Sequence, residues 1–78
     1  MRAQFIKIED IEKFVNFVSG LSGQVYLKAG EIKINAKSII GCMYIIQEHP
    51  QNIVVEVENE KEEKAVLEFL MSGEFLKR

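Results

Sequence analysis

Several residue types on which common protein classes depend are almost missing from this sequence. Among its 78 residues there is one cysteine, Cys42, one histidine, His49, and no tryptophan. One cysteine excludes an intramolecular disulfide, and so few thiol and imidazole groups exclude the usual four-ligand zinc site. No stretch approaches the ~20 consecutive apolar residues of a membrane-spanning helix, and the N-terminus lacks the apolar core of a signal peptide. We therefore expect a cytoplasmic protein that binds no metal and no membrane.

A strong net charge is also missing. Ten lysines and arginines stand against twelve aspartates and glutamates, which gives a net charge of −2. This value is too small to steer a protein toward nucleic acid. The chain contains no glycine-rich phosphate loop and no Ser-His-Asp order of the kind that hydrolases use. These absences predict no nucleic acid partner, no cofactor, no catalytic residue and hence no enzyme.

What the sequence has in quantity is apolar residues at regular spacing. Hydrophobic residues make up 47% of the chain and charged residues 28%, as in a folded protein, and the length predicts a single domain over residues 1–78. Apolar and polar residues alternate, as in strands, in four segments: 4–9, 24–29, 31–36 and 52–58. Helical spacing marks three more: 11–21, 38–48 and 60–72. The resulting order, β-α-β-β-α-β-α, predicts a two-layer α/β (α+β) sandwich with the helices on one face of the sheet.

Local signals place the ends of these elements. We predict Asp10 as the N-cap of the first helix, and Asn59 as that of the third, with Glu62 completing a capping box. Gly30 is expected to form the turn between the second and third strands, because glycine adopts a positive φ without steric cost. Gly73 is expected to end the third helix and to leave residues 74–78 as a partly ordered tail.

The second helix is apolar on two sides. Cys42, Ile45 and Ile46 share one arc, which we expect to face the core. A second arc, where a helix on a sheet is normally polar, carries four more large side chains: Ile39, Ile40, Met43 and Tyr44. Either the third helix covers this second arc, or a small domain simply exposes some apolar area here, or the arc is a binding surface for a partner.

The stretch GEIKINAKSIIGCMYI, residues 30–45, resembles the HPr family, the small histidine phosphocarriers of the bacterial sugar phosphotransferase system (PTS). The resemblance continues through NIVVEVENEKEEKAVLEFL, residues 52–70. It implies an open-faced β-sandwich in which a four-stranded antiparallel sheet lies under three helices, in agreement with the element order above.

The beginning of the chain departs from that family. An HPr protein carries a phosphorylatable histidine, followed by Ala, Arg and Pro, where its first helix starts. Here no His, Arg or Pro lies between Glu9 and Gly23, and Glu9, Asp10 and Glu12 would repel a phosphate. His49 lies at the far end of the second helix and is interpreted as a surface residue. We therefore predict that the chain carries no phosphoryl group on histidine.

Two features remain as candidate sites. Ser38 matches the serine that a kinase phosphorylates in many HPr proteins, and it is also a favourable N-cap for the second helix. Ile39, Ile40 and Met43 match the family's docking surface, to which Tyr44 adds. The predicted function is that of a regulatory, protein-binding module of the PTS. The alternative is a structural or self-associating α/β domain without a PTS role, for which a homodimer is the expected assembly if it associates.

Overall fold

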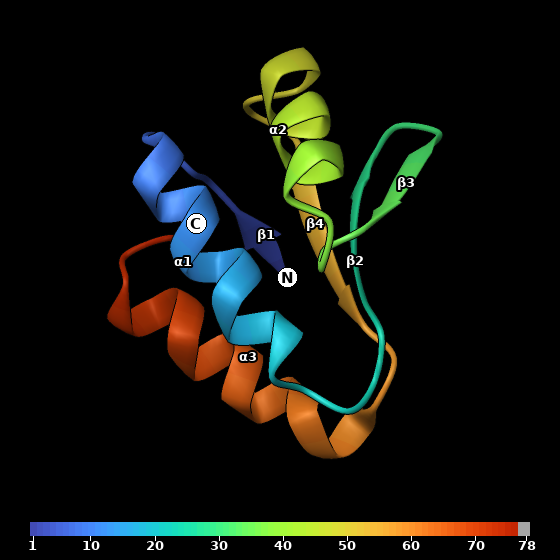
Figure 1. Cartoon of the computed structure of the whole chain (residues 1–78), viewed down its shortest axis with the longest axis vertical. Helices are drawn as coiled ribbons and strands as arrows, with labels where there is room; N and C mark the ends of the chain where they lie inside the picture. The colour runs from blue at the N-terminus through green and yellow to red at the C-terminus, as the bar shows by residue number, and fades with distance from the viewer. Residues whose placement is uncertain (77–78) are drawn as a thin grey trace.

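Four strands form one antiparallel sheet in this computed structural model, which describes residues 1–76. Across the sheet the strands stand in the order β1-β4-β2-β3. Their bounds are β1 Arg2–Ala3, β2 Val25–Ala29, β3 Ile32–Asn35 and β4 Ile53–Val57. Three helices complete the fold: α1 Ile8–Ser19, α2 Ile39–Glu48 and α3 Glu60–Ser72. The predicted order β-α-β-β-α-β-α is confirmed, and Figure 1 shows α1 and α3 side by side.

The two faces of the sheet differ in chemistry. On β2, Val25, Leu27 and Ala29 are buried beneath the helices, whereas Tyr26 and Lys28 point to the other face. On that open face the Lys28 ammonium lies 3.3 Å from the Glu56 carboxylate of β4. The sheet is therefore covered on one side only, as an open-faced sandwich requires. The turn from β2 to β3 is made by Gly30, whose φ of 59° confirms the predicted left-handed conformation.

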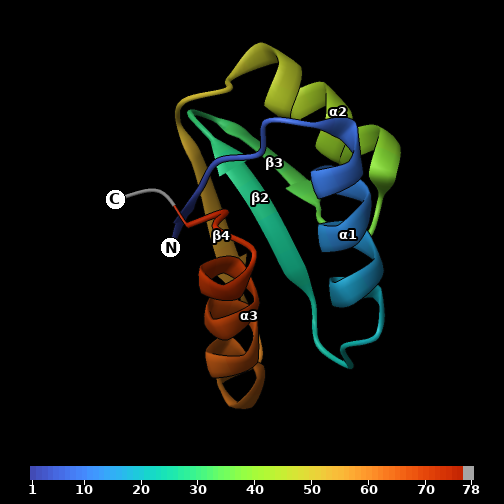
Figure 2. The same cartoon turned by 90° about the vertical axis from the view of Figure 1, so that its left-hand side faces the viewer.

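The five phenylalanines of the chain meet in the core. Their ring contacts link α1 and α3 with the segments before α1 and after α3. The ring centroids lie 5.1 Å apart in the pair Phe5–Phe14, 5.5 Å in Phe5–Phe75 and 4.4 Å in the stacked pair Phe17–Phe69. Such pairs add to the stability that burial of the rings provides. In Figure 2 the segment before α1 and the turn after α3 lie close to each other beside β4, where Ala3 bridges to Leu76.

The predicted tail is wrong for its first three residues. After Gly73 ends α3, as predicted, Glu74 takes a φ of 62° and turns the chain back toward the core. Phe75 is consequently buried, its carbonyl accepts a hydrogen bond of 2.7 Å from the Gln4 N–H, and Leu76 forms a bridge with Ala3. The last two residues of the predicted tail lie outside the described residues.

The predicted first strand over residues 4–9 and the predicted N-cap at Asp10 are also wrong. Helix α1 begins three residues earlier than expected, with Lys7 as its N-cap. Asp10 lies in the first turn instead, where its carboxylate accepts a hydrogen bond of 3.2 Å from the Lys7 N–H. An acidic side chain there satisfies a free backbone donor and lies favourably at the positive end of the helix dipole. The alternation of apolar residues in this segment therefore does not reflect a strand.

The start of α3 confirms one prediction and corrects another. Asn59 is the N-cap, and its side-chain oxygen accepts from the Lys61 N–H at 3.0 Å. Glu62 does not complete a capping box. Its carboxylate accepts instead from the N–H groups of Ser22 (2.9 Å) and Gly23 (2.8 Å), in the loop between α1 and β2. The Ser22 N–H, followed by the Gly23 N–H, lowers the pKa of the Glu62 carboxyl, because both bonds favour its charged form.

Candidate functional site

Ser38 fixes the beginning of α2. Its backbone is extended, and its hydroxyl oxygen accepts a hydrogen bond of 3.2 Å from the Gly41 N–H, as an N-cap does. The preceding residue, Lys37, is held on both sides. Its N–H donates to the Asn35 side chain at 2.9 Å, and its ammonium donates to the Leu21 carbonyl, also at 2.9 Å. The Ser38 hydroxyl therefore lies exposed on a well-supported turn.

The inner side of α2 is packed closely on the sheet. Cys42 and Ile45 are fully buried, and Ile46 is half-buried, so the predicted inward arc is confirmed. The Cys42 thiol donates a hydrogen bond to the Ala36 carbonyl, and burial raises the pKa of that thiol from 9.0 to about 11. At Gly41 a Cβ atom would lie 3.5 Å from the Ile34 side chain, which places this flank of α2 against β3.

The outer side of α2 is an exposed apolar surface. We call it the α2 surface and define it by four residues with their exposed fractions: Ile39 (38%), Ile40 (79%), Met43 (40%) and Tyr44 (55%). The interpretation that the third helix covers these residues is wrong, because all four are open to solvent. Exposing four large side chains on one helix gives no benefit to folding, and such patches commonly mark contact surfaces.

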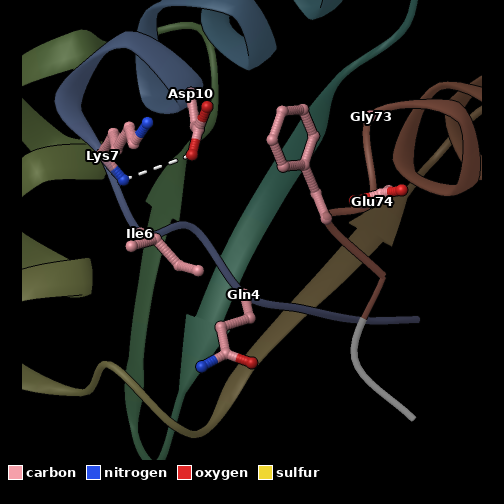
Figure 3. A pocket seen from close by; sticks show the side chains of 7 residues that line it. Gln4, Ile6, Lys7, Asp10, Gly73 and Glu74 are labelled. Atoms are coloured by element: carbon pink, nitrogen blue, oxygen red, sulfur yellow. Dashed lines mark hydrogen bonds between the residues drawn. The ribbon is translucent and has the colours of Figure 1, made fainter.

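A hollow of about 190 Å³ lies where α1 begins (Figure 3). One wall comes from the segment that enters α1, and the other comes from the turn that follows α3. The lining residues are Gln4, Ile6, Lys7, Asp10, Gly73, Glu74 and Phe75. Sequence reasoning missed this hollow, because it treated the first wall as a strand and the second as a tail.

The hollow offers little to a phosphoryl group. It contains no histidine, and its charged side chains are one ammonium, Lys7, and two carboxylates, Asp10 and Glu74. A second carboxylate in the first turn of α1, Glu9, adds to the negative charge. Backbone N–H groups at a helix start attract anions, but these carboxylates oppose a phosphate there.

His49, which was interpreted as a surface residue, lies apart from this hollow. His49 follows the last residue of α2 and acts as its C-cap, where its N–H donates to the Ile45 carbonyl at 2.9 Å. It is half-buried and does not line the hollow. Two exposed isoleucines at the start of α1, Ile6 and Ile8, were assigned to a strand by their alternation and so were missed as surface residues.

Within residues 1–76, no three His, Cys, Asp or Glu side chains gather closely enough to hold a metal ion. In the same part of the chain no helix is both long and apolar enough to cross a membrane.

Residues 8–71 match the family model described as "PTS HPr component phosphorylation site". No curated protein and no solved structure matches the chain. The matched region starts with the first residue of α1 and ends within the last turn of α3. It therefore contains Ser38 and the whole α2 surface, and its single histidine is His49.

Proposed function

The chain belongs to the family of PTS HPr components, and from this membership we propose that it acts as a protein-binding, regulatory module and not as a phosphoryl carrier. The family consists of phosphocarriers, which work by contacting other proteins. The observation that carries the proposal is the exposure of Ile39, Ile40, Met43 and Tyr44 in a chain without the family's phosphorylatable histidine. The cytoplasm, where PTS HPr components work, is the location that this proposal assigns.

The α2 surface has the composition of a contact site. Met43 is flexible and polarisable, so it adapts to the shape of a partner. Tyr44 combines a large apolar ring with a hydroxyl that can hydrogen-bond at the edge of an interface. A helix that served only to cover the sheet would be polar at these positions.

Ser38 is the proposed regulatory site on this surface. Its hydroxyl is exposed and immediately precedes Ile39, so a phosphate there would lie at the rim of the α2 surface. The phosphate would add close to two negative charges next to an N-terminal helix dipole that favours them. It would weaken the binding of an acidic partner by repulsion and that of an apolar partner by its cost of desolvation.

The proposal is tested with the double variant Met43→Lys, Tyr44→Ser. Because both side chains are exposed, we expect the variant to keep the circular dichroism spectrum and melting temperature of the wild type. In a pull-down from cells of the native host, quantified by mass spectrometry, it should lose the proteins that the wild type retains.

Val54→Lys is the matched control. The exposed fraction of Val54, 38%, is similar to the 40% of Met43, but Val54 lies on the open face of the sheet. This control should retain every partner of the wild type. Two outcomes contradict the proposal: a double variant that keeps the partners, or one that is destabilised by about 3–5 kcal/mol, as expected when a charge enters a packed interior.

A further inference from the structure

The α2 surface is bordered by one flank of α1. Phe14 and Phe17 contact Phe69, so this side of α1 faces α3. At 100° per residue, Ile8 and Glu12 point to the opposite side, which is the flank next to α2. Both are exposed, Ile8 to 55%. The apolar surface of α2 therefore continues toward Ile8, with Glu12 at its border.

The border next to α2 is acidic. Glu12 lies on the α1 flank. Glu48, the charged residue of α2 itself, is also exposed; it follows Gly41 by two helical turns and so borders the α2 surface on the β3 side. Neither carboxylate is in an ion pair with another residue of the described chain, where both ion pairs are made by Glu56 on the open face of the sheet. The last turn of α2 contains no lysine or arginine to balance the negative end of its dipole, and its C-cap is His49.

The basic residues closest in sequence are held elsewhere. The Lys37 ammonium is bonded to the Leu21 carbonyl, and Lys7 lines the hollow at the start of α1. Lys13 precedes Phe17 by one helical turn and so lies on the α3 side of α1. The carboxylates at the border of the α2 surface are therefore not neutralised by an ion pair within the described chain.

From this arrangement, and resting on the proposed function above, we propose that the α2 surface docks a basic amphipathic helix of another protein. Apolar side chains of that helix cover Ile39, Ile40 and Met43. Its lysines or arginines meet Glu12, Glu48 and the C-terminal end of α2. An amphipathic helix suits the site, because a row of residues on each of two neighbouring helices can seat a third helix.

Charge argues against a second copy of this chain as the occupant. Two copies that met through the α2 surface would bring the Glu12 and Glu48 carboxylates of both into one interface. Like charges brought together in an interface oppose association. The proposed partner has the opposite charge at the same positions.

This partner reverses the expected effect of a negative charge at Ser38. Ser38→Asp keeps a good N-cap and adds a charge at the border, whereas Ser38→Asn keeps the cap and adds none. The aspartate should tighten the binding of a basic helix by about two- to fivefold relative to the asparagine, the range of one exposed ion pair. If Ser38→Asp bound the basic helix no more tightly than Ser38→Asn, a negative charge at Ser38 would not favour this partner.

The probes for the test are two synthetic 14-residue amphipathic peptides. Both carry the same leucines, and their polar face consists of lysine in one and of glutamate in the other. Fluorescence anisotropy measures their binding to the full chain at low and high salt. The lysine peptide should bind at least about tenfold more tightly than the glutamate peptide, and added salt should weaken it, because exposed charges are screened.

Variants locate the binding. Glu12→Gln with Glu48→Gln should lower the affinity for the lysine peptide by roughly two- to thirtyfold, the range for two exposed ion pairs. Glu63→Gln with Glu68→Gln on α3 removes the same charge away from the site and should change the affinity less than twofold. Met43→Lys with Tyr44→Ser should abolish binding.

Five outcomes overturn the proposal. Equal binding of the two peptides would reject the basic partner and leave the apolar docking surface of the proposed function intact. Binding that survives Met43→Lys with Tyr44→Ser, or that weakens equally in the α3 control, would show attraction to net charge only. No binding of either peptide would also reject it. A dimer in sedimentation velocity that the Met43 and Tyr44 changes dissociate would identify a second copy as the occupant.

Discussion

Removing the hydroxyl of Ser38 tests whether this residue stabilises the fold as well as offering a regulatory site. In Ser38→Ala the Gly41 N–H loses its acceptor, which now lies 3.2 Å away. Replacing a serine N-cap by alanine costs about 0.5–2 kcal/mol. For a chain of this size we expect the melting temperature to fall by about 4–8 °C for each 1 kcal/mol lost.

The assay is thermal unfolding followed by circular dichroism, with three comparisons. Ser38→Asn and Ser38→Asp retain a capping oxygen, so both should melt close to the wild type. Ser38→Asp should be the more stable of the two, because its charge lies at the positive end of the α2 dipole. Ser19→Ala is the matched control, since Ser19 is exposed at the end of α1 and caps no helix start.

Two patterns of melting temperatures would refute the reasoning. If Ser38→Ala melted with the wild type, the hydroxyl would contribute nothing to α2, and a modification at Ser38 would have no structural effect through the cap. If Ser19→Ala fell as far as Ser38→Ala, the loss would come from alanine in general and not from the missing cap.

Three further predictions concern other parts of the chain. Incubation with enzyme I and phosphoenolpyruvate should leave the intact mass unchanged, and an acid-labile phosphate on His49 would contradict this. The pKa of Glu62 is lowered from its ordinary value of 4.5, so its contribution to stability is present above that value and is lost as the pH falls through the folded-state pKa. The difference in melting temperature between wild type and Glu62→Gln should therefore shrink in acid. A difference that stays constant with pH would argue against a role for the Glu62 charge. The Cys42 thiol, buried and with a pKa of about 11, should react with a thiol reagent only as fast as the domain opens, so rapid labelling of the folded protein at neutral pH would be inconsistent with its burial.

Much of the fold could be predicted from the sequence, because the signals involved are local. The Ser38 cap depends on residues within one helical turn, and the turn at Gly30 depends on one glycine. The alternation in β2 and β4 reports the two faces of the sheet directly, since one side of each strand is buried. For the same reason, the two apolar sides of α2 could be recognised before its surroundings were known.

The errors lie where distant residues decide the local structure. Phe5 is buried because it contacts Phe14 and Phe75, so its neighbours Ile6 and Ile8 do not form a continuing strand. Glu62 has the position of a capping box residue, but its hydrogen-bond partner is Ser22, 40 residues earlier. No local pattern in the sequence contains either contact.

The candidate site divides in the same way. The composition of the α2 surface could be seen in the sequence, but its exposure depends on where α3 packs. The hollow at the start of α1 requires the chain to turn at Glu74 and bring Phe75 back to Gln4. Its lining therefore joins the two ends of the chain, which the sequence keeps furthest apart.

The pairing of β1 also has a consequence for synthesis on the ribosome. Arg2 and Ala3 are synthesised before the rest of this sheet, but their partners in it are Val54 and Ile53, and Ala3 also bridges to Leu76. At about 5–20 residues per second, the N-terminal segment waits roughly 3–10 s for β4 to be made. During that interval the hairpin of β2 and β3 can form, whereas the side chain of Phe5 stays without its core. The nascent chain therefore exposes the apolar side chain of Phe5 until α3 leaves the exit tunnel.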